Sequence, residues 1–188
     1  MTATTPVDSI AIDTNVFEHL LNPQENVCGH IDVVLKYLED CNATLISDSK
    51  GRIEGEYDNR LGRLIECAPE GPQRQILEYW INVCHRYKVD LKFDDQLMGG
   101  IESVIREPKE TVDRIFVYVA FKSGRHLITN DRLHIVDGPE KKKGHRRAKL
   151  LKILKKRGRN IRAVDILTSC EAYTKFSAKS PGASPPTL

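Results

Sequence analysis

Long hydrophobic runs are missing from this chain. No uninterrupted apolar stretch approaches the roughly 18 residues that a membrane-spanning helix needs, and the beginning, Met1 to Pro6, lacks the basic and apolar pattern of a secretory signal. Hydrophobic residues make up 40% of the sequence and charged residues 29%, which is typical of a soluble globular protein. We therefore expect no membrane association and a cytoplasmic location.

Cysteine and histidine are few and scattered. The five cysteines include no Cys-x-x-Cys pair, and no pair of histidines flanks them. Zinc sites and disulfide frameworks both show regular cysteine spacing, so the pattern favours reduced thiols that pack as small hydrophobic side chains. The six histidines are equally dispersed, and none has a neighbour that would suggest a nucleophile with its base.

Acidic residues are absent from one segment. Between Lys141 and Arg162 the sequence has twelve Lys or Arg and no Asp or Glu, although the net charge of the whole chain is only +3. A local cationic block on an otherwise acidic protein suits a polyanionic partner, while a solvated helix face or a basic loop would have the same composition. The residues that we expect to contact a nucleic-acid backbone are Lys141, Lys142, Lys143, Arg146, Arg147 and Lys149.

Predicted strands and helices alternate along the chain. Short apolar runs bounded by turn residues predict strands, and apolar residues at three- and four-residue spacing predict helices. The expected strands are 8–13, 44–47, 89–93, 126–129 and 160–166, and the expected helices are 15–21, 30–41, 51–65, 73–86, 96–105, 110–120, 149–156 and 168–176. This order predicts an α/β protein with a three-layer α/β/α fold, in which helices cover both faces of a central parallel sheet.

The length of 188 residues suits a single domain. We expect this domain to span residues 1–176 with a basic insertion at about 138–160, and we expect a disordered tail at 177–188 because that stretch has no core-forming run. The pair Gly99 and Gly100 weakens the helix predicted at 96–105. Six residues in and beside the segment 73–86 share one side and are expected in the core: Ile76, Leu77, Trp80, Val83, Cys84 and Tyr87.

Three acidic residues lie where predicted elements begin or end. Asp13 ends the apolar run Ser9 to Ile12 and is followed at once by a helix, which is how open α/β sheets present catalytic groups. Asp113 lies in the first turn of a helix, where the helix dipole favours a carboxylate. Asp131 ends the short strand that begins at His126. Taken singly, these acids would be read as a helix cap, a dipole partner and a turn residue, but their joint occurrence in this order indicates a site.

The sequence Ile-Asp-Thr-Asn-Val-Phe at 12–17 resembles the first motif of the PIN-domain nucleases. The helix with Asp113 and the strand that ends in Thr-Asn-Asp at 129–131 resemble the last two motifs of that family, and the resemblance spans roughly residues 8 to 175. It implies a centre in which Asp13, Glu56, Asp113 and Asp131 are catalytic and bind metal, while Asn15 and Thr129 orient the groups around them. Ligation by oxygen alone implies Mg²⁺ or Mn²⁺ rather than zinc.

Two glutamates compete for the remaining acidic position. The resemblance selects Glu56, because similar sequences place the acid directly before an aromatic or aliphatic residue, as Glu56 stands before Tyr57. Helical geometry instead favours Glu54, which lies nearer to the apolar stripe that includes Ile53 and Leu61. We choose Glu56 as the metal ligand and keep Glu54 as the alternative.

The resemblance implies a metal-dependent phosphodiesterase, in which a bound ion activates water for attack on phosphorus. The expected activity is an endonuclease that cuts single-stranded RNA and leaves 5′-phosphate and 3′-hydroxyl ends. The alternatives are a nucleic-acid-binding module that does not cut, and a nuclease for single-stranded DNA in a defence system. The resemblance further suggests an antitoxin or other inhibitor protein as a partner, and a homodimer.

Overall fold

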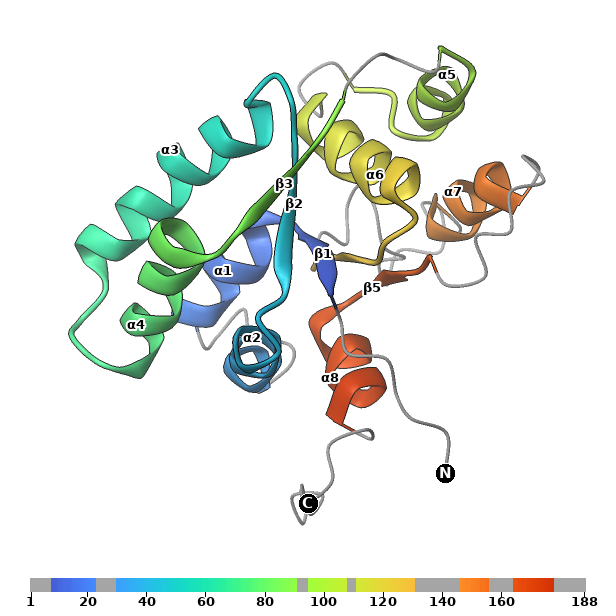
Figure 1. The fold of residues 1–188 in the computed structure, drawn as a ribbon. Helices are drawn as coiled ribbons and strands as arrows, with labels where there is room; N and C mark the ends of the chain where they lie inside the picture. Colours follow the sequence, from blue (N-terminus) through green and yellow to red (C-terminus); the bar gives the residue numbers. More distant parts are fainter. Residues whose placement is uncertain are drawn as a thin grey trace.

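A five-stranded, all-parallel sheet forms the centre of the molecule (Figure 1). The computed structural model describes residues 8–22, 30–90, 95–107, 111–130, 146–155 and 164–177. The strands are β1 (Ser9–Ile12), β2 (Thr44–Asp48), β3 (Arg86–Val89), β4 (Leu127–Ile128) and β5 (Ile166–Leu167), and their order across the sheet is β3-β2-β1-β4-β5. The prediction of an α/β protein with a parallel sheet is thus confirmed.

Helices cover both faces of this sheet (Figure 1). On one face, α6 (Thr111–Ser123) packs across β1 to β4, α5 (Asp95–Val104) packs against α6, and α7 (Arg146–Lys155) packs against α5. The helices that pack against one another in the second group are α1 (Thr14–Leu21), α2 (Ile31–Asp40), α3 (Arg52–Cys67), α4 (Pro72–Glu78) and α8 (Ser169–Ser177). The chain therefore has the expected three-layer α/β/α architecture.

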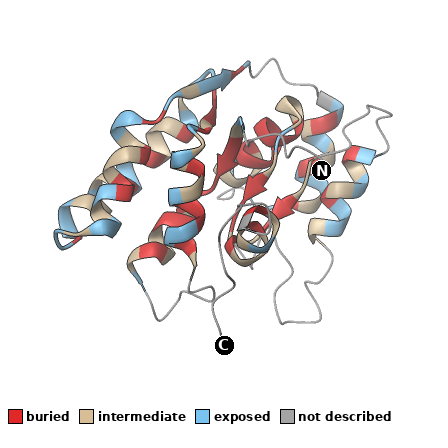
Figure 2. Ribbon diagram, turned by 60° about the horizontal axis from the view of Figure 1, so that its bottom comes forward, coloured by how far each residue is buried: buried red, intermediate tan, exposed pale blue. Residues whose placement is uncertain are grey.

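The core lies between the sheet and the inner sides of these helices, where Figure 2 shows the buried residues. Ile10, Ala11 and Ile12 of the central strand β1 have no exposed surface, as expected for a parallel strand covered on both faces. Every residue from Ile115 to Phe121 in α6 is buried, so this helix lies inside the molecule on all sides. In the part of the chain that the structure describes, no helix combines the length and apolar character that crossing a bilayer requires.

The segment 73–86 differs from its prediction. After α4 the helix continues as a π-helical turn, η1 (Tyr79–Val83), in which the amide of Cys84 donates a hydrogen bond to the carbonyl of Tyr79 at 2.9 Å. The wider turn changes the direction of the side chains that follow. Trp80 is buried, as predicted, but the core prediction for Val83 is wrong, because this side chain is 65% exposed.

Strand β3 begins at Arg86 instead of at the predicted residue 89, because the helix before it ends early. Tyr87 is 59% exposed on this strand, so its assignment to the core is also wrong. The physical reason is position, since β3 is an outer strand among the strands that the structure describes and has β2 as its neighbour there. The predicted end of this strand, residues 91–93, lies outside the described residues.

Strand β5 is shorter and later than predicted. It pairs with β4 through Leu127 opposite Ile166 and Ile128 opposite Leu167, and residues 164 and 165 are not part of a strand. Because β4 offers only two residues, it limits the length of its neighbour. The other residues of the predicted strand, 160–163, lie outside the described part of the chain, as do 178–188 of the predicted tail, while Ser177 belongs to α8.

The two glycines of α5 should respond differently to substitution. A Cβ atom built on Gly100 would lie 3.0 Å from Cγ2 of Ile153 in α7, whereas nothing lies within 4 Å of one built on Gly99. Gly99→Ala should raise the free energy of unfolding by about 0.5–1 kcal/mol, the difference in helix propensity. Gly100→Ala should not raise the free energy of unfolding, because the added methyl group would press on Ile153. Urea denaturation measures both, and equal gains would contradict close packing of α5 on α7.

Candidate functional site

Asp13 lies where β1 gives way to α1. It is the N-cap of α1, with extended backbone angles (φ −76°, ψ 146°), and only 3% of its surface is exposed. Its Oδ1 accepts hydrogen bonds from the hydroxyl of Thr14 and the backbone amide of Asn15, each at 3.4 Å. Its Oδ2 accepts from the side-chain amide of Asn15 at 2.9 Å and from the hydroxyl of Thr129 at 2.8 Å. These donors compensate a buried charge and hold the carboxylate in one orientation.

Hydrogen bonds continue from Asp13 along the carboxyl edge of the sheet. Oδ1 of Asn15 accepts from the backbone amide of Asn130 at 2.9 Å, just after β4. The side-chain oxygen of Asn130 accepts in turn from the amide of Ser169 at 3.0 Å and from its hydroxyl at 2.9 Å, at the start of α8. The ends of β1, β4 and β5 are therefore linked. The contact between Asn130 and Ser169 could not be predicted from sequence patterns, because the two residues are 39 positions apart.

The place of Asp13 in the sheet is one where α/β proteins bind ligands. β1 is the central strand, with β2 and β3 on one side of it and β4 and β5 on the other. The chain extends the sheet outward from β1 to β3, then crosses back and continues from β4. Such a reversal of strand order leaves a crevice at the carboxyl ends of the two strands that flank it. Asp13 and Thr129 directly follow these two strands, so this edge is the candidate active site.

Tyr57 fixes α3 against β1 next to Asp13. Its ring is buried, and its hydroxyl donates a hydrogen bond to the carbonyl of Ile12, the residue before Asp13. Burial, and then the negative charge of Asp13, raise the pKa of Tyr57 well above its usual value. The hydroxyl therefore keeps its proton and remains a donor over the physiological pH range.

The two glutamates of α3 lie in different surroundings. The carboxylate of Glu54 lies 3.1 Å from the ammonium group of Lys88 on β3. Glu56 instead forms an ion pair with Arg60, whose guanidinium also lies 3.0 Å from Glu18 on α1. The two candidates for the metal-site glutamate are therefore both paired, but with cations on different sides of α3.

Arg60 links Glu56 electrostatically to Asp13. Partial burial of Arg60 disfavours its charge, but Glu56, Glu18 and Asp13 all favour it, and the pKa of Arg60 is raised as a result. Asp13 and Glu56 thus act on the same guanidinium group. Glu54 has a comparable link, because Arg86, 4.0 Å from Glu54, acts together with Asp13 on the buried hydroxyl of Tyr57.

Asp113 is partly buried in the first turn of α6. This turn lies at the carboxyl edge, because α6 leads through a turn at Gly124 back to the start of β4 (Figure 1). Asp131, the last predicted ligand, lies outside the described residues. Among the residues described, no three His, Cys, Asp or Glu side chains lie close enough together to hold a metal ion.

The structure therefore brings Asp13 together with Asn15 and Thr129, and it does not bring Asp13, Glu56 and Asp113 into one metal-binding group. The predicted donors nevertheless have the right chemistry for a hard divalent cation, since all of them are oxygen atoms and the four predicted ligands are carboxylates.

Asp48 is a further carboxylate at this edge, at the end of β2. It has no exposed surface, and it accepts hydrogen bonds from the backbone amides of Lys50 and Arg52, each at 3.2 Å, and of Ile53 at 2.7 Å. Amides at the start of a helix have no acceptor within the helix itself. Asp48 therefore has a structural role, as the acceptor for the first turn of α3. An Asp shortly before a predicted helix is the signal that could have identified this role.

Helix α7 carries part of the predicted basic surface. Lys149 is exposed, and so are Lys152 and Lys155. Arg147 was predicted to contact nucleic acid, but its guanidinium contacts the protein. It donates hydrogen bonds to the carboxylate of Glu171 at 2.6 Å and to the carbonyl of Ile166 at 3.2 Å. Arg146 is half-buried, and residues 141–143 lie outside the described part of the chain. The lysines of α7 are thus the exposed cations on this helix.

Comparisons with protein-family models, with curated proteins and with solved structures found no match. The resemblance to PIN-domain nucleases therefore depends on the motifs around Asp13, Asp113 and Asp131. The fold adds a parallel sheet whose central strand carries Asp13 at its carboxyl end, in contact with Thr129.

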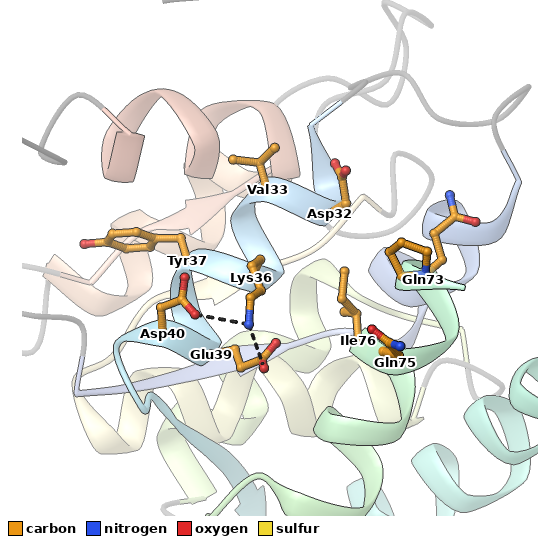
Figure 3. A pocket seen from close by; sticks show the side chains of 10 residues that line it. Asp32, Val33, Lys36, Tyr37, Glu39, Asp40, Gln73, Gln75 and Ile76 are labelled. Carbon is orange, nitrogen blue, oxygen red and sulfur yellow. Dashed lines mark hydrogen bonds and ion pairs between the residues drawn. The ribbon is translucent and has the colours of Figure 1, made fainter. Parts of the chain in front are cut away.

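Two cavities among the described residues bear on the location of the site. One, of about 540 Å³, is formed by α2 and α4, and in it Lys36 pairs with Glu39 and Asp40 (Figure 3). It contains none of the acids predicted for the site, so its size does not make it the active site. The other, of about 380 Å³, is bounded by α5 and by the first turns of α3 and α6, and Arg52 and Arg114 help to line it. This smaller cavity adjoins the carboxyl edge.

Proposed function

We propose that this protein is a divalent-metal-dependent endonuclease of the PIN type, which hydrolyses phosphodiester bonds in single-stranded RNA and leaves 5′-phosphate and 3′-hydroxyl ends. The observation that carries the proposal is the buried carboxylate of Asp13, held by Thr129 and Asn15 where β1 and β4 end. A buried, oriented charge at the crevice of a parallel sheet is typical of a catalytic group.

Asp13, Glu56, Asp113 and Asp131 would hold Mg²⁺ or Mn²⁺. Such an ion, when bound, lowers the pKa of a water molecule and so supplies the nucleophile. Asn15 and Thr129 would orient the ligand and not bind the ion. Both donate hydrogen bonds to Oδ2 of Asp13 and so fix the plane of its carboxylate. Partners of this kind commonly decide how well a ligand is positioned.

The lysines of α7 supply positive charge for a nucleic-acid backbone. Lys149, Lys152 and Lys155 are exposed on a helix that contains no acidic residue. Such contacts attract phosphates without reading the base sequence, and they weaken as the salt concentration rises. Single-stranded RNA is our preferred substrate because a single strand can reach a shallow acidic site. An inhibitor protein as partner, a homodimer and a cytoplasmic location are parts of the same proposal.

A nucleic-acid-binding protein that does not cut is the second candidate. The ion pair between Glu56 and Arg60 favours it, because this pair engages a carboxylate that the nuclease needs for its cation. A protein of this kind would bind RNA through the same lysines and leave it intact.

Cleavage of end-labelled single-stranded RNA separates the two candidates. We expect hydrolysis with Mg²⁺ or Mn²⁺ and none with a chelator, and the products should carry 5′-phosphates. Single-stranded DNA of the same base sequence, assayed in parallel, tests the choice of substrate, and cutting of DNA alone would favour the defence nuclease. Binding of RNA without cleavage would support the second candidate, and absence of both would contradict both proposals.

A further inference from the structure

A short chain of charges connects α1 with α3 beside Asp13. The guanidinium of Arg60 pairs with Glu56, one turn earlier on α3, and donates a hydrogen bond to Glu18 of α1 at 3.0 Å. The side chain of Glu56 is 21% exposed, while those of Glu18 and Arg60 are 36% and 50% exposed. Glu56 is therefore the inner end of this chain, and Arg60 reaches it from the solvent side.

Three carboxylates act on this single guanidinium. Glu56 and Glu18 touch it, and Asp13 adds a negative potential that contributes to the raised pKa of Arg60. Several carboxylates in one region disfavour one another's charge unless a cation compensates them. Arg60 is the cation that two of these carboxylates contact directly, so it compensates them in the structure.

The side chain of Arg60 is suited to leave Glu56. It is half exposed, and an ion pair with this much access to water is weak and depends on a side chain that has many rotamers. Glu18 offers it a second acceptor on α1, so the guanidinium keeps a partner when it gives up the first. The contact with Glu56 is the one that a bound cation would replace, because that carboxylate is the predicted metal ligand.

We propose that Arg60 is an internal competitor of the divalent cation: its guanidinium occupies Glu56, and cation binding displaces it toward Glu18 and solvent. The inference rests on the proposed function, since it takes Glu56 as a metal ligand. It explains why Glu56, a predicted metal ligand, lies in an ion pair. It also makes the affinity for the cation depend on Arg60, which is not itself a ligand. Arg60 would then set the cation concentration at which the site assembles.

Binding of Mn²⁺ to the full chain, measured by isothermal titration calorimetry, tests this role. Arg60→Gln should bind Mn²⁺ about tenfold more tightly than the unchanged protein, because no positive charge then competes for Glu56. Arg60→Lys keeps the charge and should remain closer to the unchanged protein. Arg63→Gln removes the same charge from an exposed position of α3 and is the matched control, with a change of about twofold at most.

A second measurement needs no substitution. In the unchanged protein, addition of Mg²⁺ should shift the Nε–Hε resonance of Arg60 in the NMR spectrum more than that of Arg63, because only Arg60 loses a partner. A resonance of Arg60 that stays in place while Mg²⁺ binds would overturn the proposal, and so would equal Mn²⁺ affinities for Arg60→Gln and Arg63→Gln.

Failure of this inference differs from failure of the proposed function. A protein that binds Mn²⁺ and cuts RNA, but gains no affinity from Arg60→Gln, would remove only the role of Arg60. A protein that neither binds Mn²⁺ nor cuts RNA would remove the nuclease proposal and this inference with it.

Discussion

Asp13→Asn should reduce metal-dependent cleavage of RNA by at least about 100-fold, since the loss of groups that merely orient a metal ligand already costs about 10–100-fold. Asn has the same shape as Asp, and its side-chain oxygen can still accept the hydrogen bond from Thr129. It lacks the negative charge that makes a carboxylate a strong ligand for a divalent cation. The initial rate of hydrolysis of labelled RNA in Mg²⁺ measures the loss.

The matched control is Asp58→Asn, which makes the same change at an exposed position of α3 and should leave the rate unchanged. Thermal unfolding followed by circular dichroism verifies that both variants are folded. Thr129→Val removes the donor 2.8 Å from Oδ2 of Asp13. Its rate of RNA hydrolysis should lie between those of the two Asp variants, with a loss of about 10–100-fold. Full cleavage by folded Asp13→Asn protein would remove Asp13 from the reaction.

The surroundings of Asp13 could be predicted from the sequence because their signals are local. A run of apolar residues, a carboxylate and a helix start follow one another within nine positions, and β1, the Asp13 cap and α1 lie where this run places them. The strand before Thr129 is equally local. Contact between Asp13 and Thr129 follows once both strands are parallel neighbours, because carboxyl ends then share one edge.

Other parts of the site could not be predicted, because they depend on pairs that are distant in the sequence. Glu56 and Arg60 are one turn apart, but their connection to Glu18 exists only because α1 packs on α3. The contact between Arg147 and Glu171 likewise requires α7 and α8 to meet. A basic block in the sequence therefore suggests binding, while the fold decides which of its cations face the protein.

The start of β3 could not be predicted for a different reason. The apolar spacing of Trp80 and Cys84 continues the pattern of an α-helix, and a π-helical turn keeps both of them buried while it exposes Val83. Spacing alone does not distinguish the two kinds of turn. Because this π-helical turn ends the helix at Val83, strand β3 begins at Arg86, three residues earlier than predicted.

Asp48→Ala should lower the free energy of unfolding by about 3 kcal/mol, because it leaves buried amides without the charged acceptor that they have in the folded protein. The amide of Ile53, 2.7 Å from Oδ1, is the most buried of the three donors, and those of Lys50 and Arg52 share Oδ2. The loss is large because Asp48 itself has no exposed surface, so water cannot easily replace it. Urea denaturation followed by circular dichroism measures the change.

Asp48→Asn distinguishes the effect of the hydrogen-bond acceptor from that of the negative charge, because Asn keeps a side-chain oxygen but is neutral. Its single side-chain oxygen can serve Ile53, but its amide group would face the amides of Lys50 and Arg52, so the loss should be smaller than for Ala but not zero. Asp58→Ala, an exposed position on the same helix, should change the free energy of unfolding by about 0.5 kcal/mol or less.

Mn²⁺ binding then distinguishes a cap from a metal ligand at the same edge of the sheet. If Asp48 serves α3 alone, the folded part of the Asp48→Ala sample should keep the Mn²⁺ affinity of the unchanged protein. Loss of Mn²⁺ binding with unchanged stability would instead show that the carboxylate of Asp48 belongs to the cation, and the acidic site would then include the end of β2 beside the residues proposed on β1, α3 and α6.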